Sequence, residues 1–182
     1  MRVLRLFIFL FLFLFSTAYA DSASSRKGFF GSIGVSGSYE ANKLKAPGFG
    51  MGIQIGGGLS EQFLLFYWSH GGGILYDNAT GKRAGLVYLP IEFGMKYFLS
   101  SGNSPYFVGG AGFALVNTFS ETILATAKAR DGYGPSISAG MGYEWVLTSW
   151  FGFETQFLTT FIRAKSQNLF FLELGLNAAF YF

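Results

Sequence analysis

Hydrophobic and polar residues alternate with a period of two along most of the chain after residue 28, and clusters of Gly, Ser, Asn, Asp and Pro interrupt the alternation. In residues 87–97 every odd position holds a large apolar side chain, and the charges Glu92 and Lys96 stand at even positions. Side chains of a β-strand alternate between its two faces, whereas those of an amphipathic helix repeat every three or four residues. The alternation therefore predicts strands, each with one apolar face.

Eight alternating segments can be delimited in this way, and turn-forming residues separate them. They are residues 28–39, 49–59, 63–70, 87–97, 106–118, 136–145, 151–157 and 170–182. The pattern leaves the facing of two segments open, because residues 63–70 are apolar throughout and glycines interrupt residues 106–118.

The two faces of the predicted strands differ in size as well as in polarity. One face carries bulky apolar side chains, and the other carries mostly Gly and Ser with a few charges. A soluble barrel would need charged and hydroxyl side chains on its outer face, and the narrow lumen of an eight-stranded barrel has room only for side chains. We therefore predict an all-β fold, an eight-stranded antiparallel up-and-down transmembrane β-barrel, with the bulky face towards lipid.

The composition agrees with a membrane protein that crosses in strands. Charged residues make up 13% of the chain and hydrophobic residues 51%, whereas a soluble domain carries about 25% charged residues. After residue 20 no apolar stretch approaches the roughly 20 residues that a helical span requires. The chain has no cysteine, which excludes disulfides and thiolate metal sites.

The first 20 residues have the three parts of a secretory signal peptide. Arg2 and Arg5 precede an unbroken apolar run at 6–15, and a small-residue site with Ala18 and Ala20 follows. Cleavage after Ala20 would leave a short N-terminal lead at 21–27 and a barrel domain at 28–182. Removal of both arginines lowers the net charge of the chain from +3 to +1, which gives no support to a nucleic-acid partner.

Short and long links alternate between the predicted strands. The short links are residues 60–62, 100–104 and 147–149, and the long ones are residues 40–47, 71–83, 119–132 and 162–167. Outer-membrane barrels have short periplasmic turns and longer outer loops, with both termini on the periplasmic side. Aromatic residues also crowd the ends of the strands near the short links, as an interfacial belt would.

These features resemble the small bacterial outer-membrane barrels of the OmpA transmembrane-domain and OmpX type over nearly all of residues 28–182. The most specific match is the last segment, which alternates apolar residues and ends on a terminal aromatic. The resemblance implies a place in the outer membrane, contact with its lipid and lipopolysaccharide, and recognition of the last strand by the barrel-assembly machinery. The residues that carry this C-terminal signal are Leu174, Leu176, Phe180 and Phe182.

Five charges and one amide stand on the predicted inner face. They are Gln54, Glu92, Lys96, Glu144, Glu154 and Glu173. Buried charges persist when they are paired and hydrogen-bonded, so we expect a polar network that fills the lumen. Carboxylates outnumber Lys96, so at least one is protonated or pairs with Tyr88, Tyr181, Gln54 or a loop arginine such as Arg163. The alternative is a narrow pore that prefers cations.

A second alternative is an enzyme that modifies lipid A. The single histidine of the chain, His70, would be its candidate catalytic base. The resemblance extends to deacylases of this membrane, in which a serine follows the histidine by two residues, but here that position is Gly72. Ser69 is next to His70 in the sequence, but this does not let it take the role of the missing serine. The side chains of a nucleophile and its base must contact each other. We therefore expect His70 to be a polar residue at a loop edge, and we expect no catalytic site, cofactor or metal.

The long links carry more positive than negative side chains. The cations are Lys43, Lys45, Lys82, Arg83, Lys128, Arg130, Arg163 and Lys165, and the acids are Glu40, Asp77, Glu121 and Asp131. Such a rim would attract lipopolysaccharide phosphates or anionic host ligands. We therefore predict a structural and surface-interaction protein, and the pattern leaves its oligomeric state open.

Overall fold

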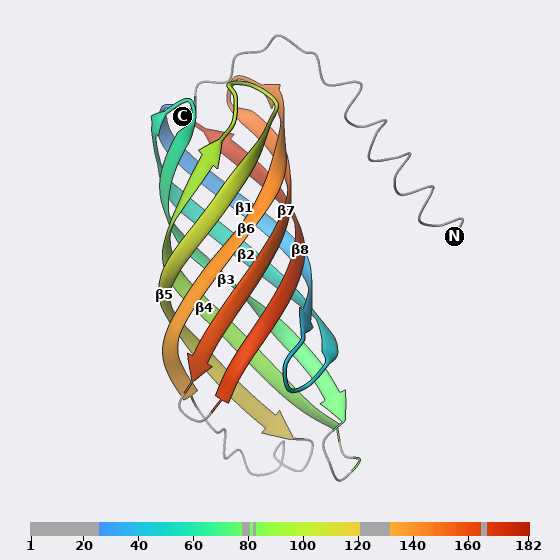
Figure 1. The fold of residues 1–182 in the computed structure, drawn as a ribbon. Helices are drawn as coiled ribbons and strands as arrows, with labels where there is room; N and C mark the ends of the chain where they lie inside the picture. The colour runs from blue at the N-terminus through green and yellow to red at the C-terminus, as the bar shows by residue number, and fades with distance from the viewer. Residues whose placement is uncertain (1–25, 78–80, 82, 121–131, 165–166) are drawn as a thin grey trace, which may run out of the picture.

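The computed structural model describes residues 26–77, 81, 83–120, 132–164 and 167–182. The predicted signal peptide, with Ala18 and Ala20, lies outside these residues. The described chain forms eight antiparallel strands in one closed barrel, in which each strand pairs with its neighbour in sequence and β1 pairs with β8 (Figure 1). The strands are β1 (Gly28–Glu40), β2 (Ala46–Ser60), β3 (Phe63–Asp77), β4 (Arg83–Phe98), β5 (Ser104–Ser120), β6 (Gly132–Thr148), β7 (Phe151–Ala164) and β8 (Gln167–Tyr181). The predicted fold class is confirmed.

The strands are 13 to 17 residues long, which is longer than most of the predicted segments. In β3 the difference includes most of a predicted loop, because residues 71–77 were predicted as a loop and are strand. Consecutive glycines suggest a turn, but here they allow close approach of two strands. A Cβ atom on Gly72 would lie 2.3 Å from the carbonyl oxygen of Phe49. No helix in the described part of the chain is long and apolar enough to cross a membrane.

The short links lie at one end of the barrel, together with the start of β1 and the C-terminus (Figure 1). We call this end the short-turn end and the opposite one the long-loop end. Backbone hydrogen bonds of 2.9 Å join Phe29 and Phe182 in both directions and close the barrel at the short-turn end.

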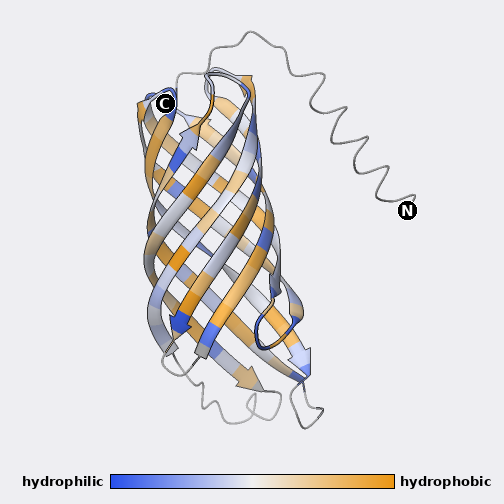
Figure 2. Ribbon diagram, in the orientation of Figure 1, coloured by the Kyte–Doolittle hydropathy of each residue, from blue (hydrophilic) through white to orange (hydrophobic). Residues whose placement is uncertain are grey.

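The apolar faces of the strands point outward, as predicted, and hydrophobic residues are distributed over the strands around the barrel (Figure 2). The neighbours Phe93 and Glu92 illustrate the contrast, since Phe93 is 63% exposed and Glu92 is 1% exposed. The structure also settles the facing of β3 and β5, in which the even-numbered residues point inward.

Two layers of apolar side chains fill the bore. The layer at the short-turn end, the short-turn plug, comprises Phe30, Leu64, Phe66, Trp68, Phe98, Tyr106, Val108, Leu158, Ala179 and Tyr181. The layer at the other end, the long-loop plug, comprises Ala46, Ile74, Leu86, Tyr88, Ala114, Val116, Ile162, Ala164, Leu169 and Phe171. Polar side chains occupy the space between the plugs and the space around the short-turn plug.

Candidate functional site: the filled bore

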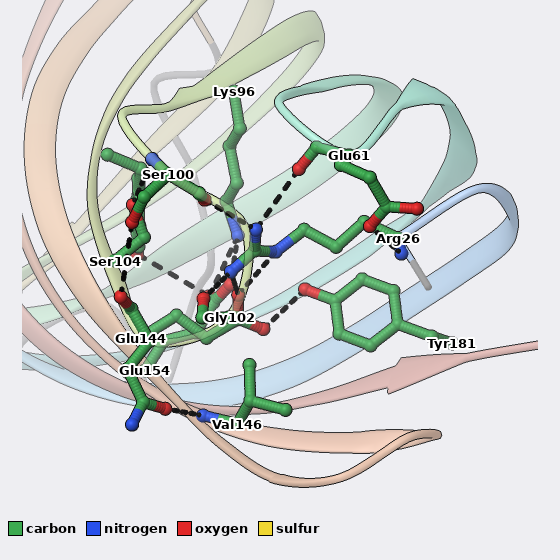
Figure 3. Close-up of polar contacts among 12 residues, drawn as sticks. Arg26, Glu61, Lys96, Ser100, Gly102, Ser104, Glu144, Val146, Glu154 and Tyr181 are labelled. Atoms are coloured by element: carbon green, nitrogen blue, oxygen red, sulfur yellow. Dashed lines mark hydrogen bonds and ion pairs between the residues drawn. The ribbon is translucent and has the colours of Figure 1, made fainter. Parts of the chain in front are cut away.

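Arg26 precedes β1, and its side chain enters the bore at the short-turn end (Figure 3). Its Nε atom donates to Oε2 of Glu144 at 2.8 Å, and Nη2 lies 2.7 Å from the same oxygen. Nη1 donates to the carbonyl oxygens of Glu61 and Ser100 at 3.0 Å each, and Nη2 donates to the carbonyl oxygen of Gly102. All three guanidinium nitrogens therefore have acceptors, which come from two turns and from β6.

The surroundings of Arg26 fit a guanidinium better than an ammonium group. The guanidinium carbon lies 3.9 Å from the centroid of the Phe98 ring. A planar guanidinium group stacks favourably on an aromatic face at this distance. The backbone of Arg26 passes over β2 at Gly58, where a Cβ atom would lie 1.5 Å from the Arg26 carbonyl oxygen. Arg26 was not predicted as an inward-facing cation, because residues 21–27 were interpreted as a short N-terminal lead. The excess of inward-facing glutamates over Lys96 was the available signal that another cation was needed.

A second ion pair lies within the short-turn plug. Nζ of Lys96 donates to the two carboxylate oxygens of Glu154 at 2.7 and 2.8 Å, and both side chains are fully buried (Figure 3). The hydroxyl of Tyr181 donates to Oε1 of Glu144 at 2.5 Å, so Glu144 also has two partners. A buried pair is favourable only when further hydrogen bonds satisfy its remaining atoms, and this region meets that condition.

The sequence-based placement of His70 at a loop edge is wrong. His70 is 4% exposed and points into the bore midway between the plugs, because β3 continues past it to Asp77. Its Nε2 atom lies 3.6 Å from Oε2 of Glu92, and its Nδ1 atom lies 3.6 Å from Oε1 of Glu173. The ring also lies against Trp68, with centroids 4.3 Å apart. His70 therefore lies between two carboxylates that are remote from Lys96, within ion-pair distance of both.

Ser138, His70 and Glu173 are the residue types of a nucleophile, a base and an orienting acid. Oγ of Ser138 lies 3.3 Å from Nε2 of His70 and 3.1 Å from the hydroxyl of Thr160. A reaction also needs space for a substrate beside the nucleophile, but Ser138 is 2% exposed. The cavity beside His70 has a volume of about 30 Å³, and Ser138 is not among the residues that line it. This geometry favours a structural role.

The six residues predicted for the polar network all lie inside the barrel, but they form two groups instead of one. Lys96, Glu144 and Glu154 belong to the short-turn end. Glu92 and Glu173 flank His70 in the middle layer, and Gln54 lines the cavity there. Among the described residues, no group of three or more His, Cys, Asp or Glu side chains is arranged to hold a metal ion.

Four partners were suggested for the surplus carboxylates, and they differ in where the structure places them. Gln54 lines the cavity beside His70, and its Oε1 atom has no hydrogen-bond partner. Tyr181 binds Glu144. Tyr88 instead stacks on Phe171 with ring centroids 3.8 Å apart, and its hydroxyl has no hydrogen-bond partner. Arg163 is exposed on the outward face of β7, so it does not enter the bore. The additional cation that the carboxylates need is Arg26.

The long-loop end carries exposed cations in the described part of the chain: Lys43, Lys45, Arg83 and Arg163. Glu40 is buried there, and its carboxylate accepts hydrogen bonds from backbone N–H groups of the β1–β2 link and of β8. Asp77 is exposed and lies opposite Arg83 in the β3–β4 ladder. The other six charges predicted for this rim lie outside the described residues.

The C-terminal strand has the predicted facing. Leu174, Leu176 and Phe182 are exposed on the outer wall, and Phe180 is half-buried between neighbouring rings. Their recognition by the barrel-assembly machinery stays a prediction.

No family model and no curated protein matches the sequence. Solved structures of small barrels do match the fold, at low sequence identity. Neisserial surface protein A is 14% identical with a TM-score of 0.65, and the match covers 86% of this chain and 98% of that protein. OprG from Pseudomonas aeruginosa is 14% identical with a TM-score of 0.55, covering 89% of this chain and 100% of that one. Ail from Yersinia pestis, in complex with the heparin analogue sucrose octasulfate, is also 14% identical with a TM-score of 0.55. The match covers 85% of this chain and 99% of that one.

The closed eight-stranded barrel and these neighbours define the structural class. The chain has the fold of the small outer-membrane barrels, as the resemblance to the OmpA and OmpX type predicted.

Proposed function

We propose that this protein is an outer-membrane barrel with a structural and surface-interaction role, and that it does not form a pore. The observation that carries this proposal is the filled bore. The two plugs place large buried side chains such as Phe66 and Phe171 across the bore near both ends. Hydrated ions need an open, water-filled path through the bore, and the large side chains of each plug occupy that space.

The outer-membrane location is part of the proposal. An exposed apolar wall needs a lipid environment, because a soluble protein rarely exposes so much apolar surface. Strands that close into a barrel leave no unpaired backbone edge in the hydrocarbon region. In this orientation the short-turn end faces the periplasm and the long-loop end faces outward. Export would use the predicted signal peptide.

We further propose that the long-loop end binds polyanions, namely lipopolysaccharide phosphates or sulfated host glycans. Lys43, Lys45, Arg83 and Arg163 supply exposed positive charge at this end, while Glu40 is buried and bound to backbone N–H groups. The binding of a heparin analogue by Ail, which has the same fold, supports the same chemistry here. Such binding would weaken as salt screens the charges.

Two measurements test the proposal. In planar bilayers, we expect the folded protein to produce no ion-selective openings, and steady openings lost on Glu92→Gln or Glu144→Gln would show the alternative pore. On heparin and on lipopolysaccharide, we expect Lys43→Glu with Lys45→Glu to weaken binding. The matched control is Lys27→Glu, an exposed lysine at the short-turn end. Equal loss with the control variant would contradict binding by the long-loop end.

A further inference from the structure

The cavity beside His70 lies in the polar layer between the two plugs, along the wall formed by β8, β1 and β2. Its volume is about 30 Å³. Three glycines, Gly34, Gly52 and Gly175, contribute no side chain to this wall and so leave the space. The polar side chains that line it are Ser32, Ser36, Gln54, His70, Gln156, Glu173 and Asn177.

Two buried polar atoms of this lining have no hydrogen-bond partner, namely Oε1 of Gln54 and Nδ1 of His70. Gln54 is 3% exposed and His70 is 4% exposed. Glu173 lies beside them, and its Oε2 atom accepts a hydrogen bond from Ser36 at 3.5 Å, the upper limit of such a bond. A buried polar atom without a partner is destabilising, so this lining favours a small ligand that can donate and accept.

We propose that this cavity is a binding site for two water molecules. A water needs roughly 10–15 Å³ of such volume and two to four polar partners, and both conditions are met here. One water would donate to Gln54, and the other would bridge His70 and Glu173. Water suits His70 whichever ring nitrogen carries its proton, because water can act as donor or acceptor.

The site would also join the two polar groups of the bore. Nδ2 of Asn177 donates to Oε2 of Glu154 at 3.4 Å, and Asn177 lines the same cavity as His70 and Glu173. Water in the cavity would therefore connect the Lys96–Glu154 pair with the His70 cluster, so that one hydrogen-bonded network runs from the short-turn end to the middle of the bore.

Gly175→Ala is a direct test because it adds a methyl group to the lining of the cavity without a clash and so leaves less room for water. A Cβ atom there would lie 3.4 Å from the carbonyl oxygen of Val35 and 3.6 Å from Cβ of Ser36, which are ordinary contacts. The matched control is Gly109→Ala on β5, which points outward and whose nearest atom would lie 3.7 Å away.

The experiment is nuclear Overhauser spectroscopy of the full barrel in nanodiscs, which detects contacts between protein amides and long-lived water. We expect water contacts at the side-chain amides of Gln54 and Asn177, weaker contacts in Gly175→Ala, and unchanged contacts in Gly109→Ala. The absence of these contacts in the folded wild-type barrel, or contacts of unchanged strength in Gly175→Ala, would overturn the proposal. Shifts of these amide signals on exchange of sodium for potassium would also overturn it, because they would indicate a bound cation.

Discussion

Nε of Arg26 donates to Oε2 of Glu144 at 2.8 Å and so joins the segment before β1 to β6 on the opposite side of the bore. The pair is fully buried. The two residues lie 118 positions apart in the sequence, so the pair joins distant parts of the chain. We call Arg26 the clamp residue.

Replacement of this clamp should destabilise the barrel strongly. We expect Arg26→Ala to lower the free energy of unfolding by about 3–5 kcal/mol, because it leaves Glu144 buried without its cation. Arg26→Lys should recover only part of the lost stability. An ammonium group is a compact charge and cannot donate to all the acceptors that the planar guanidinium group binds. Urea unfolding in lipid vesicles measures both. Lys27→Ala, next to the clamp but exposed, should change stability by less than about 0.5 kcal/mol.

The Lys96–Glu154 pair should show strong coupling between its two members. We expect Lys96→Met to cost about 3–5 kcal/mol because it strands a buried carboxylate. The double variant Lys96→Met with Glu154→Gln should be more stable than the single variant Lys96→Met. A double-mutant cycle gives the coupling energy, and simple additivity of the two losses would contradict the buried pair.

His70 should matter for stability and have no effect on lipid chemistry. We expect His70→Ala to lower the free energy of unfolding by about 1–3 kcal/mol, since Glu92 and Glu173 lose the group between them. Mass spectrometry of lipid A from cells with and without the protein, or with this variant, should show one common pattern. A modification that disappears in His70→Ala would establish the enzymatic alternative. Ser69→Ala, at a neighbouring outward-facing position, serves as the control for folding.

Glycines of the strands should differ according to how closely a neighbouring backbone approaches. A Cβ atom on Gly140 would lie 2.1 Å from the carbonyl oxygen of Phe157, so we expect Gly140→Ala to lower stability by about 1–3 kcal/mol. Gly109→Ala meets no such contact and should be neutral or stabilising by up to about 1 kcal/mol. Equal effects of the two substitutions on the unfolding midpoint would contradict this packing.

The period of two was sufficient to predict the strands in which the bore-facing side is small or polar. It identified the apolar face of β4 because Glu92 and Lys96 mark the opposite face. It could not orient β3, because its inward residues Phe66 and Trp68 are as apolar as its outward ones, and it could not orient β5, because glycines interrupt the alternation there. Phe66 and Trp68 belong to the short-turn plug, so the ambiguity of β3 reflected a structural role.

The candidate site was only partly accessible to sequence reasoning. The inward charges of regular strands could be placed from the alternation alone. The partners could not, because the contacts of Arg26 with Glu61, Ser100 and Glu144 join positions 35, 74 and 118 residues apart. His70 was misplaced because the glycines after it are typical of a turn, whereas here they allow close strand packing.

The sidedness of the wall is the central claim, and labelling of single cysteines with a reagent confined to the lipid phase tests it most directly. Ser136 and Ile137 are suitable neighbours on β6, because Ser136 is 5% exposed inside the bore and Ile137 is 57% exposed on the outer wall. In the barrel reconstituted in lipid, we predict that Ile137→Cys is labelled and Ser136→Cys is spared. Labelling of Ser136→Cys with protection of Ile137→Cys would contradict the account.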